Sequence, residues 1–435
     1  MSRSLLYVCV AVTGMASLVY QLVWQRYLAT LIGSEARSAA LVVAVFLLGL
    51  SIGYYLFGRL TEAVREKGRL LKLYGWLEII TASYAISFPS LFLLLQSLAF
   101  SGPLSFAFDL FLVLVAILLP TILMGATVPV MTMVIPESPE EVNDCHAKVY
   151  GWNTAGAFIG VLGGGLIVIP QMGLPVTLYL VGAVNLIVGV IYGLNRLTGQ
   201  AYESQEIKRP NVHLSNPVLY GLVFLIGAIT IGLEIVFVRI VSLTIGASVY
   251  VFPIVLGCVV LGIGLGSLSI QNRQVSSKSL LLRLAMSSGV LALAYLTVPY
   301  WPSIANHIRV SLTSIPSNMF IYFSLIFLTL GSILVPAFYL LGQILPLIYS
   351  YTDKTQSNYG RVCGNLYFFN TIGTVLGSVF LGYWLLHFLS VEDVFLVSIL
   401  LVMVCGLGLG VLQKNLKFGV TIGVLFLVVL LLPKW

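Results

Sequence analysis

Charged side chains are scarce in this sequence. They make up 9% of the 435 residues, whereas hydrophobic residues make up 59% and the mean hydropathy is +1.04. A soluble domain carries about 25% charged residues, so a soluble enzyme is excluded. A chain this apolar has to bury its surface in lipid. We therefore expect an all-α polytopic membrane protein that has the lipid bilayer as a partner and no enzymatic activity.

Cysteine is also scarce, which argues against a disulfide framework and against a metal site. The five cysteines are odd in number and lie scattered, mostly in apolar segments: Cys9, Cys145, Cys258, Cys363 and Cys405. Their spacing fits no metal motif. Acids, a cysteine and a histidine gather at 140–146, but unconvincing ligand spacing favours a solvated acidic cytoplasmic loop over a metal site. We expect no metal and no cofactor.

Long apolar runs define the predicted membrane crossings, each of about 20 residues. In the first half the runs are 4–25, 38–58, 70–100, 106–135 and 149–195. The last is too long for one crossing, and the turn from Pro170 to Pro175 divides it in two. In the second half they lie near 217–242, 248–270, 280–301, 319–350, 362–388 and 392–412. A final stretch, 418–433, is predicted as a short thirteenth crossing, with an interfacial helix as the alternative.

The first run could be taken for a signal peptide. No small-residue cleavage site followed by a soluble body supports that interpretation, so we expect a crossing there.

The basic residues give the orientation. With the N-terminus in the cytoplasm, 17 of the 22 basic residues fall on the inner side: Arg3, Arg59, Arg65, Lys67, Arg69, Lys72, Lys148, Arg196, Lys208, Arg209, Arg273, Lys278, Arg283, Lys354, Arg361, Lys414 and Lys417. The positive-inside rule predicts this orientation. The net charge of +7 therefore reflects membrane topology and does not indicate nucleic acid as a partner.

The two halves are related in sequence. A shift of 213 positions aligns Gly14, Gln21, Trp24 and Arg26 with Gly227, Glu234, Phe237 and Arg239. A shift of 216–217 aligns Pro120 and Pro129 with Pro336 and Pro346, and Asn153-Thr154 with Asn370-Thr371. We expect an N-terminal six-helix repeat at 1–196, a cytoplasmic linker at 197–216, a C-terminal six-helix repeat at 217–413 and an apolar segment at 414–435. Copies separated by six crossings face the same way, as in the parallel repeats of the major facilitator superfamily.

Three stretches carry a resemblance to a known family: residues 14–26 with 48–53, residues 119–129 and residues 150–160. Together they resemble the membrane part of bacterial fused major facilitator/spermidine synthase proteins. The likeness spans most of the first half and is looser in the second. It implies a facilitator-like fold in the bacterial cytoplasmic (inner) membrane. Family members often carry a soluble aminopropyltransferase-like domain after the membrane part, whereas this sequence runs to Trp435 without one.

A glycine cluster imitates a nucleotide-binding loop. Gly262, Gly264 and Gly266 lie inside an apolar span, however, without the strand and the acidic residue that such a loop requires. Close packing of helices through small residues explains these glycines better.

Ionisable residues within membrane spans are candidates for function by default. Glu234 is the strongest, with Gln21 as its repeat mate; the resemblance implies that the first and seventh helices line a central cavity. Glu234 could bind a cation or carry a coupling proton, or form a structural ion pair with Arg26 or Arg239. Glu78 is a second candidate, with snorkelling to the interface or a polar cap as the alternatives.

Further candidates are polar or aromatic. Asn153 and Asn370 fit interhelical hydrogen bonding, with cavity lining as the second interpretation. Tyr20 and Trp24 could wall a cavity or anchor at the interface. Breaks at corresponding prolines of two repeats point to a transport site, and kinks needed for packing are the alternative. The paired positions are Pro120, Pro129, Pro336 and Pro346.

A gating loop is suggested by similarity. Residues 58–69 are similar to the facilitator loop between the second and third helices, in which an acid and arginines hold a cytoplasmic gate. Here Glu62, Arg65 and Arg69 would serve, although Glu62 replaces the usual aspartate and the spacing is longer.

The sequence thus predicts a facilitator-like transporter of a small polar organic solute. A polyamine or another amine is suggested by the family resemblance. The alternative is a non-transporting anchor or accessory subunit for a partner enzyme, such as a separate aminopropyltransferase-like protein.

Overall fold

The structure is a computed structural model, and all the elements that it describes are helical. It describes residues 2–32, 35–64, 66–101, 105–194, 216–246, 248, 250–270, 277–313, 318–352 and 358–413, together with scattered positions beyond 422. The predicted linker and the predicted thirteenth crossing lie almost wholly outside the described residues. So does Arg65 of the predicted gating loop.

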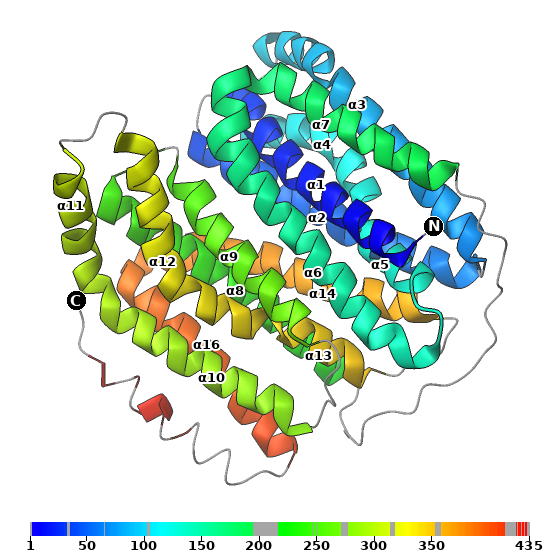
Figure 1. The fold of residues 1–435 in the computed structure, drawn as a ribbon. Coiled ribbons are helices and arrows are strands. Elements are labelled where there is room, and N and C mark those ends of the chain that lie inside the picture. Colours follow the sequence, from blue (N-terminus) through cyan, green and yellow to red (C-terminus); the bar gives the residue numbers. More distant parts are fainter. Residues whose placement is uncertain are drawn as a thin grey trace. The chain divides into compact units, whose positions relative to one another are not determined.

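The helices of the first half begin and end close to the predicted apolar runs (Figure 1). They are α1 (Arg3–Ile32), α2 (Glu35–Ala63), α3 (Lys67–Ser101), α4 (Phe106–Met124), α5 (Thr127–Val134), η1 (Pro139–Glu141), α6 (Val142–Ile159), η2 (Gly160–Val168) and α7 (Ile169–Gly193). The helical stretch is kinked within α7, at Gly173, where φ is +77°. The kink falls inside the predicted turn, so this long stretch makes two crossings.

The second half repeats this order. Its elements are α8 (Asn216–Ile245), α9 (Val251–Leu268), α10 (Ser277–Thr297), η3 (Val298–Tyr300), α11 (Trp301–Ser311), α12 (Asn318–Gly342), α13 (Ile344–Tyr351), α14 (Tyr359–Val379), η5 (Phe380–Trp384), α15 (Leu385–Phe388) and α16 (Val391–Leu412). Within the described residues, 11 helical segments are long and apolar enough to cross a membrane, and one of them is the kinked pair at Val142–Gly193.

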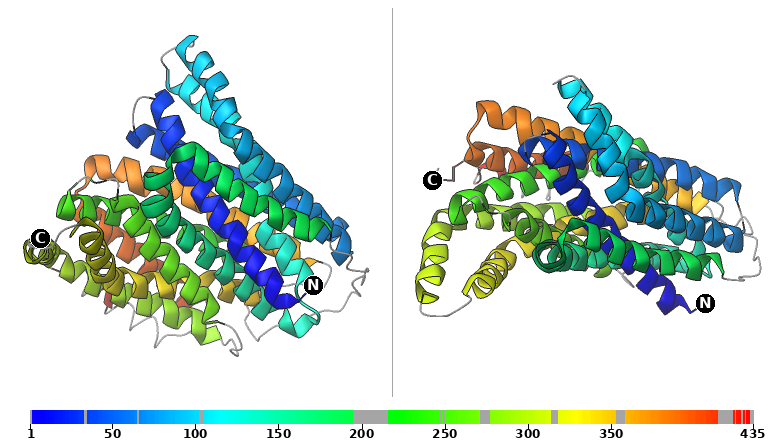
Figure 2. Two further views of the ribbon diagram at one scale, coloured as in Figure 1. Left: turned by 45° about the horizontal axis from the view of Figure 1, so that its top comes forward. Right: turned by 90° about the horizontal axis from the view of Figure 1, so that it is seen from above.

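One helix of the second half was not predicted. After α10, residues Trp301–Ser311 form the short amphipathic helix α11, which Figure 2 shows between α10 and α12. Trp301 and Ala305 are buried, whereas the polar residues Ser303, Asn306, His307 and Arg309 are exposed. The search for spans overlooked α11 because its apolar stripe is too short and too interrupted to cross a bilayer.

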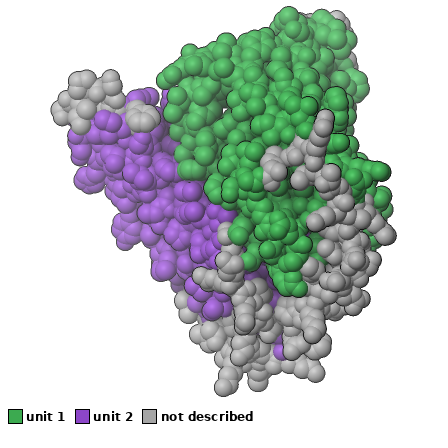
Figure 3. All heavy atoms as spheres, turned by 45° about the vertical axis from the view of Figure 1, so that its right-hand side comes forward, with its two compact units in different colours: residues 1–208, 352–372 green, residues 209–351, 373–435 purple. Residues whose placement is uncertain are grey.

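The chain forms two compact units (Figure 3). Unit 1 consists of residues 1–208 and 352–372, and unit 2 of 209–351 and 373–435. Residues 359–372 of α14 belong to unit 1, and residues 373–379 belong to unit 2.

Small residues set the closest helix crossings, and the crossings recur in both units. A Cβ atom added at Gly156 of α6 would lie 1.7 Å from the carbonyl oxygen of Ala11 in α1. In unit 2 a Cβ atom at Gly373 would lie 2.0 Å from the carbonyl oxygen of Phe224 in α8. These glycines are repeat mates, as are Ala11 and Phe224. Matching contacts at matching positions support the internal repeat in structure as well as in sequence.

The same packing explains the glycines that imitate a nucleotide loop. A Cβ atom at Gly262 would lie 2.7 Å from Phe338, and one at Gly266 would lie 2.1 Å from the carbonyl oxygen of Tyr339. Both contacts are with α12, so these glycines allow two helix backbones to approach.

Candidate functional site

Each repeat contains a broken helix at the paired prolines. In unit 1, α4 ends at Met124 and α5 begins at Thr127, between Pro120 and Pro129. In unit 2, α12 ends at Gly342 and α13 begins at Ile344, between Pro336 and Pro346. A proline lacks an amide N–H and crowds the preceding turn, so a helix carrying two of them within ten residues is prone to break.

A polar contact ties each break to the third helix of its own repeat. In unit 1 the Tyr74 hydroxyl of α3 lies 2.7 Å from the hydroxyl of Thr127, the first residue of α5. In unit 2 Arg283 Nε of α10 donates to Gln343 Oε1 over 2.8 Å, and Gln343 Nε2 donates to Ser269 Oγ over 2.8 Å. Gln343 sits in the interruption between α12 and α13. The breaks are therefore held by specific polar side chains in both units.

Glu234 lies in the middle of α8 and is half-buried within unit 2. Among the described residues no ion pair with Glu234 is present, and Arg239 is exposed further along the helix. The structural ion pair that was the alternative for Glu234 is thus not observed in the described part of unit 2. A half-buried carboxyl in an apolar helix remains.

A π-helical segment packs beside Glu234. Leu381 of η5 contacts Gly232, two residues before the acid, and Ile235 fills the space at Gly382. Short π-helical segments inside α-helices are rare and are frequent at functional sites. No sequence pattern predicted this π-helical segment, since its residues are typical of an apolar membrane helix.

Unit 1 has a matching π-helical segment beside Gln21. Gly164 of η2 contacts Val19, two residues before Gln21, and Gln21 is itself buried. In the repeat alignment Gly164 corresponds to Leu381, and Val19 corresponds to Gly232. The first helix of the repeat therefore supplies the large residue of this contact in unit 1 and the small residue in unit 2. Both halves thus place a polar residue of their first helix next to an irregular helix.

Glu78 lies deep inside unit 1, with 4% of its surface exposed. Its carboxyl faces the Tyr74 hydroxyl and the side chain of Asn185 in α7. Cys9 and Tyr20 of α1 and Tyr192 of α7 lie within electrostatic range. Burial at this depth is not a snorkelling position at the membrane surface, which was one alternative for this residue.

The aromatic candidates of α1 are buried rather than interfacial. Tyr20 and Trp24 are both fully enclosed in unit 1, and their rings stack with centroids 5.5 Å apart. Trp24 also packs against Phe88 of α3. Through these contacts both aromatic residues pack in the interior of unit 1, and Trp24 joins α1 to α3.

The remaining intramembrane candidates are only partly buried. Arg26 is half-buried in unit 1, and Asn153 lies where α6 crosses Gly14 of α1. Asn370 is half-buried in α14.

An ion pair forms at the C-terminal end of α2. Arg361 Nη1 of α14 lies 2.9 Å from Glu62 Oε2, both within unit 1. Arg69 instead pairs with Glu66, three residues away, with Nε 2.5 Å from Oε2. Glu62, the acid predicted for the gating loop, therefore pairs with Arg361, which is distant in sequence. The similarity of residues 58–69 to the facilitator loop did not indicate this partner.

The acidic segment at 137–146 serves different contacts. Arg3 pairs with Glu137 over 3.0 Å and with Glu141 over 2.7 Å. The Arg3 guanidinium lowers the pKa of Glu141 below its usual value. His146 is buried, with Nδ1 3.3 Å from Thr132 Oγ1 and 3.7 Å from Cys363 Sγ. No group of three or more His, Cys, Asp or Glu side chains suited to a metal occurs among the described residues.

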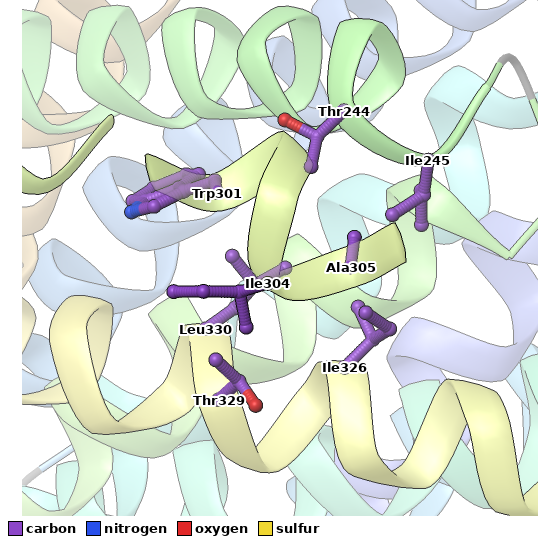
Figure 4. Close-up of a pocket in the computed structure, with 8 residues that line it drawn as sticks. All are labelled: Thr244, Ile245, Trp301, Ile304, Ala305, Ile326, Thr329 and Leu330. Atoms are coloured by element: carbon purple, nitrogen blue, oxygen red, sulfur yellow. The ribbon is translucent and has the colours of Figure 1, made fainter. Parts of the chain in front are cut away.

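A small apolar pocket lies in unit 2 (Figure 4). It is lined by Thr244 and Ile245 of α8, by Trp301, Ile304 and Ala305 of α11, and by Ile326, Thr329 and Leu330 of α12. It does not include Glu234, and its lining is almost wholly hydrophobic.

Comparisons with known proteins give the fold. No family model matches the sequence, and no curated protein matches it. Two solved structures of a bacterial homologue of the iron transporter ferroportin, both in the outward-facing state and one with soaked iron, match in three dimensions. Each is 12% identical with a TM-score of 0.57; the matches cover 95% and 94% of this chain and 99% of theirs. At this identity the likeness concerns architecture alone: the chain is an all-α membrane protein with the two six-helix repeats of the major facilitator fold.

Proposed function

We propose that the protein is a facilitator-type transporter of a small polar organic solute, in which Glu234 binds a cation or carries a coupled proton. It would act in the bacterial cytoplasmic membrane with its N-terminus in the cytoplasm. The observation that carries the proposal is the half-buried Glu234 in α8, for which the described residues provide no ion pair.

The physical argument concerns the cost of a charge in an apolar span. An ionised carboxylate in a membrane helix needs a counter-charge, a hydrogen-bonding environment or water. A proton or a cationic solute supplies the compensation that the described side chains do not. The half-buried position leaves the carboxyl within reach of such a ligand.

An amine is the solute class that suits this site. A protonated amine forms a charge-assisted hydrogen bond with a carboxylate. The resemblance to fused major facilitator/spermidine synthase proteins makes a polyamine, such as spermidine, the first solute to test.

Iron is the second solute to test, because the structural neighbours are homologues of an iron transporter. Ferrous iron takes several nitrogen or oxygen ligands in known protein sites. The described part of the chain offers no cluster of three such side chains, so we place iron after the amine.

An accessory subunit that holds a partner enzyme is the competing function. Such a subunit needs no solute-dependent activity of its own. Uptake by the purified protein in liposomes therefore separates the two functions.

The experiment compares Glu234→Gln with Glu140→Gln in liposomes containing labelled spermidine. Both substitutions are nearly isosteric and remove one negative charge, but Glu140 lies in the short segment η1, outside the apolar spans. We expect Glu234→Gln to abolish uptake at unchanged thermal stability, and Glu140→Gln to transport normally.

A stabilising role predicts the reverse pattern. Breaking a buried ion pair costs about 3–5 kcal/mol. Normal uptake combined with a lower melting temperature in Glu234→Gln would therefore reject the proposed role. The same comparison with ferrous iron tests the second solute.

A further inference from the structure

The most enclosed acid described in the membrane helices is Glu78, and transport through Glu234 does not account for it. Glu78 lies in α3 of unit 1 with 4% of its surface exposed. The groups that face it are Tyr74 on its own helix, Tyr20 and Cys9 on α1, and Asn185 and Tyr192 on α7. All of them are neutral side chains at physiological pH.

No basic side chain among the described residues pairs with Glu78. Removing a lone carboxylate from water is far more costly than removing a neutral hydrogen-bonded group. The tyrosine hydroxyl and the amide can hydrogen-bond a carboxyl group in either protonation state. A bound proton therefore compensates the charge of Glu78 where no basic side chain among the described residues does.

The second repeat provides a natural comparison. Aligning Leu71 and Pro89 of α3 with Leu281 of α10 and Pro299 of η3 places Ser288 at the position of Glu78. Aligning Gly189 of α7 with Gly406 of α16 places Val402 at the position of Asn185.

Ser288 and Val402 are both fully buried, as Glu78 and Asn185 are. The Ser288 hydroxyl donates to the carbonyl oxygen of Leu284 on its own helix. At the positions that correspond to Glu78 and Asn185, unit 2 therefore packs its helices with a serine and a valine. Its own buried acid, Glu392 of α16, lies elsewhere in this contact and accepts a hydrogen bond from the Tyr295 hydroxyl of α10 over 2.6 Å.

A single side chain, that of Tyr74, connects Glu78 with the broken helix of unit 1. Its neighbour Tyr74 contacts Thr127 at the start of α5 over 2.7 Å and Thr13 of α1 over 3.4 Å. An ionised Glu78 would compete for the Tyr74 proton, because a charged acceptor forms a stronger hydrogen bond than a neutral hydroxyl. The protonation state of Glu78 thus acts directly on the contact that holds α3 to α5.

We propose that Glu78 is a proton-binding site that loads and unloads during the transport cycle and controls the contact between Tyr74 and Thr127. In the loading step the carboxylate accepts a proton from hydronium and becomes a neutral carboxylic acid, leaving water. In the unloading step the proton returns to water and the carboxylate draws the Tyr74 hydroxyl away from α5. The cyclic role rests on the proposed transport function, whereas the protonation itself does not.

Protonation is measured first, without any solute. Infrared difference spectra of the protein in liposomes, recorded as the pH is changed, detect the carbonyl-stretching band of a protonated carboxylic acid. We expect the titrating band of wild type to lose one component in Glu78→Gln, a component that Glu234→Gln and Ser288→Ala both keep. A titrating band in Glu78→Gln equal in intensity to that of wild type, or a wild type without one, overturns the proposal.

Tyr74→Phe covers the case in which Glu78→Gln fails to fold. It retains the acid but removes the hydroxyl that faces it, so the band should remain and shift in frequency. An unshifted band in Tyr74→Phe overturns the proposed coupling between Glu78 and Tyr74.

The role in the cycle is measured by uptake as a function of pH. We expect the pH dependence of wild-type uptake to flatten in Glu78→Gln, with Ser288→Ala unchanged. Unaltered pH dependence in Glu78→Gln overturns the cyclic role. Failure of the proposed function is distinguishable, because normal uptake by Glu234→Gln rejects the role of Glu234 while leaving the titrating band of Glu78 intact.

Discussion

The crossing of α1 and α6 at Gly156 supports a quantitative test of the packing. In Gly156→Ala the new methyl group would lie 1.7 Å from the Ala11 carbonyl oxygen. Normal contact requires about 3.5 Å, so the two backbones must separate by more than an ångström. Overpacking of this kind costs about 1–3 kcal/mol. Membrane helices associate through close packing, because lipid tails are as apolar as the helix surfaces. The hydrophobic effect therefore cannot compensate for the packing that Gly156→Ala would lose.

The repeat and the neighbouring glycines provide controls for Gly156→Ala. Gly373→Ala meets the Phe224 carbonyl oxygen at 2.0 Å in unit 2 and should destabilise to a similar degree. Gly221→Ala in α8 meets nothing within 4 Å and should be neutral or slightly stabilising, since alanine favours a helix by about 1 kcal/mol over glycine. Thermal unfolding in detergent measures all three. A melting temperature for Gly156→Ala equal to that of Gly221→Ala would refute the packing described for α1 and α6.

Three further predictions concern other contacts. Gln343→Leu should lower stability by about 1.5–3 kcal/mol, because Arg283 Nε–H loses its acceptor, whereas Ser269→Ala should cost about 0.5–1.5 kcal/mol; equal thermal shifts would contradict this. The pKa of Glu141 is lowered by Arg3, so its stabilisation is present above the usual glutamate value of about 4.3 and disappears as the pH falls through the lowered pKa. Glu141→Gln should therefore be less stable than wild type at neutral pH and equal to it in acid; an equal gap at both pH values would contradict the pair. A cysteine at Glu140→Cys should react with impermeant reagents only from the cytoplasmic side, and labelling of intact cells from outside would overturn the topology.

The sequence determined the features that depend on local composition. Apolar runs placed the crossings, because a helix in lipid must be apolar over about 20 residues. The turn between Pro170 and Pro175 marked the kink that the structure has at Gly173. The paired prolines lie at the breaks of α4 and α12, because a missing N–H disrupts a helix wherever it occurs. The internal repeat was visible for the same reason: its glycines sit where two backbones must approach closely.

Tertiary structure alone decided which side chains meet. Sequence spacing gave no sign that Glu62 pairs with Arg361, that Tyr74 holds Thr127, or that π-helical segments flank Gln21 and Glu234. Tyr20 and Trp24 showed the same limit, because an aromatic near a helix end suits a membrane interface and a bundle interior equally. These outcomes depend on the rotation and depth of each helix against its neighbours. Both are set by the packing of several helices together, which no single segment encodes.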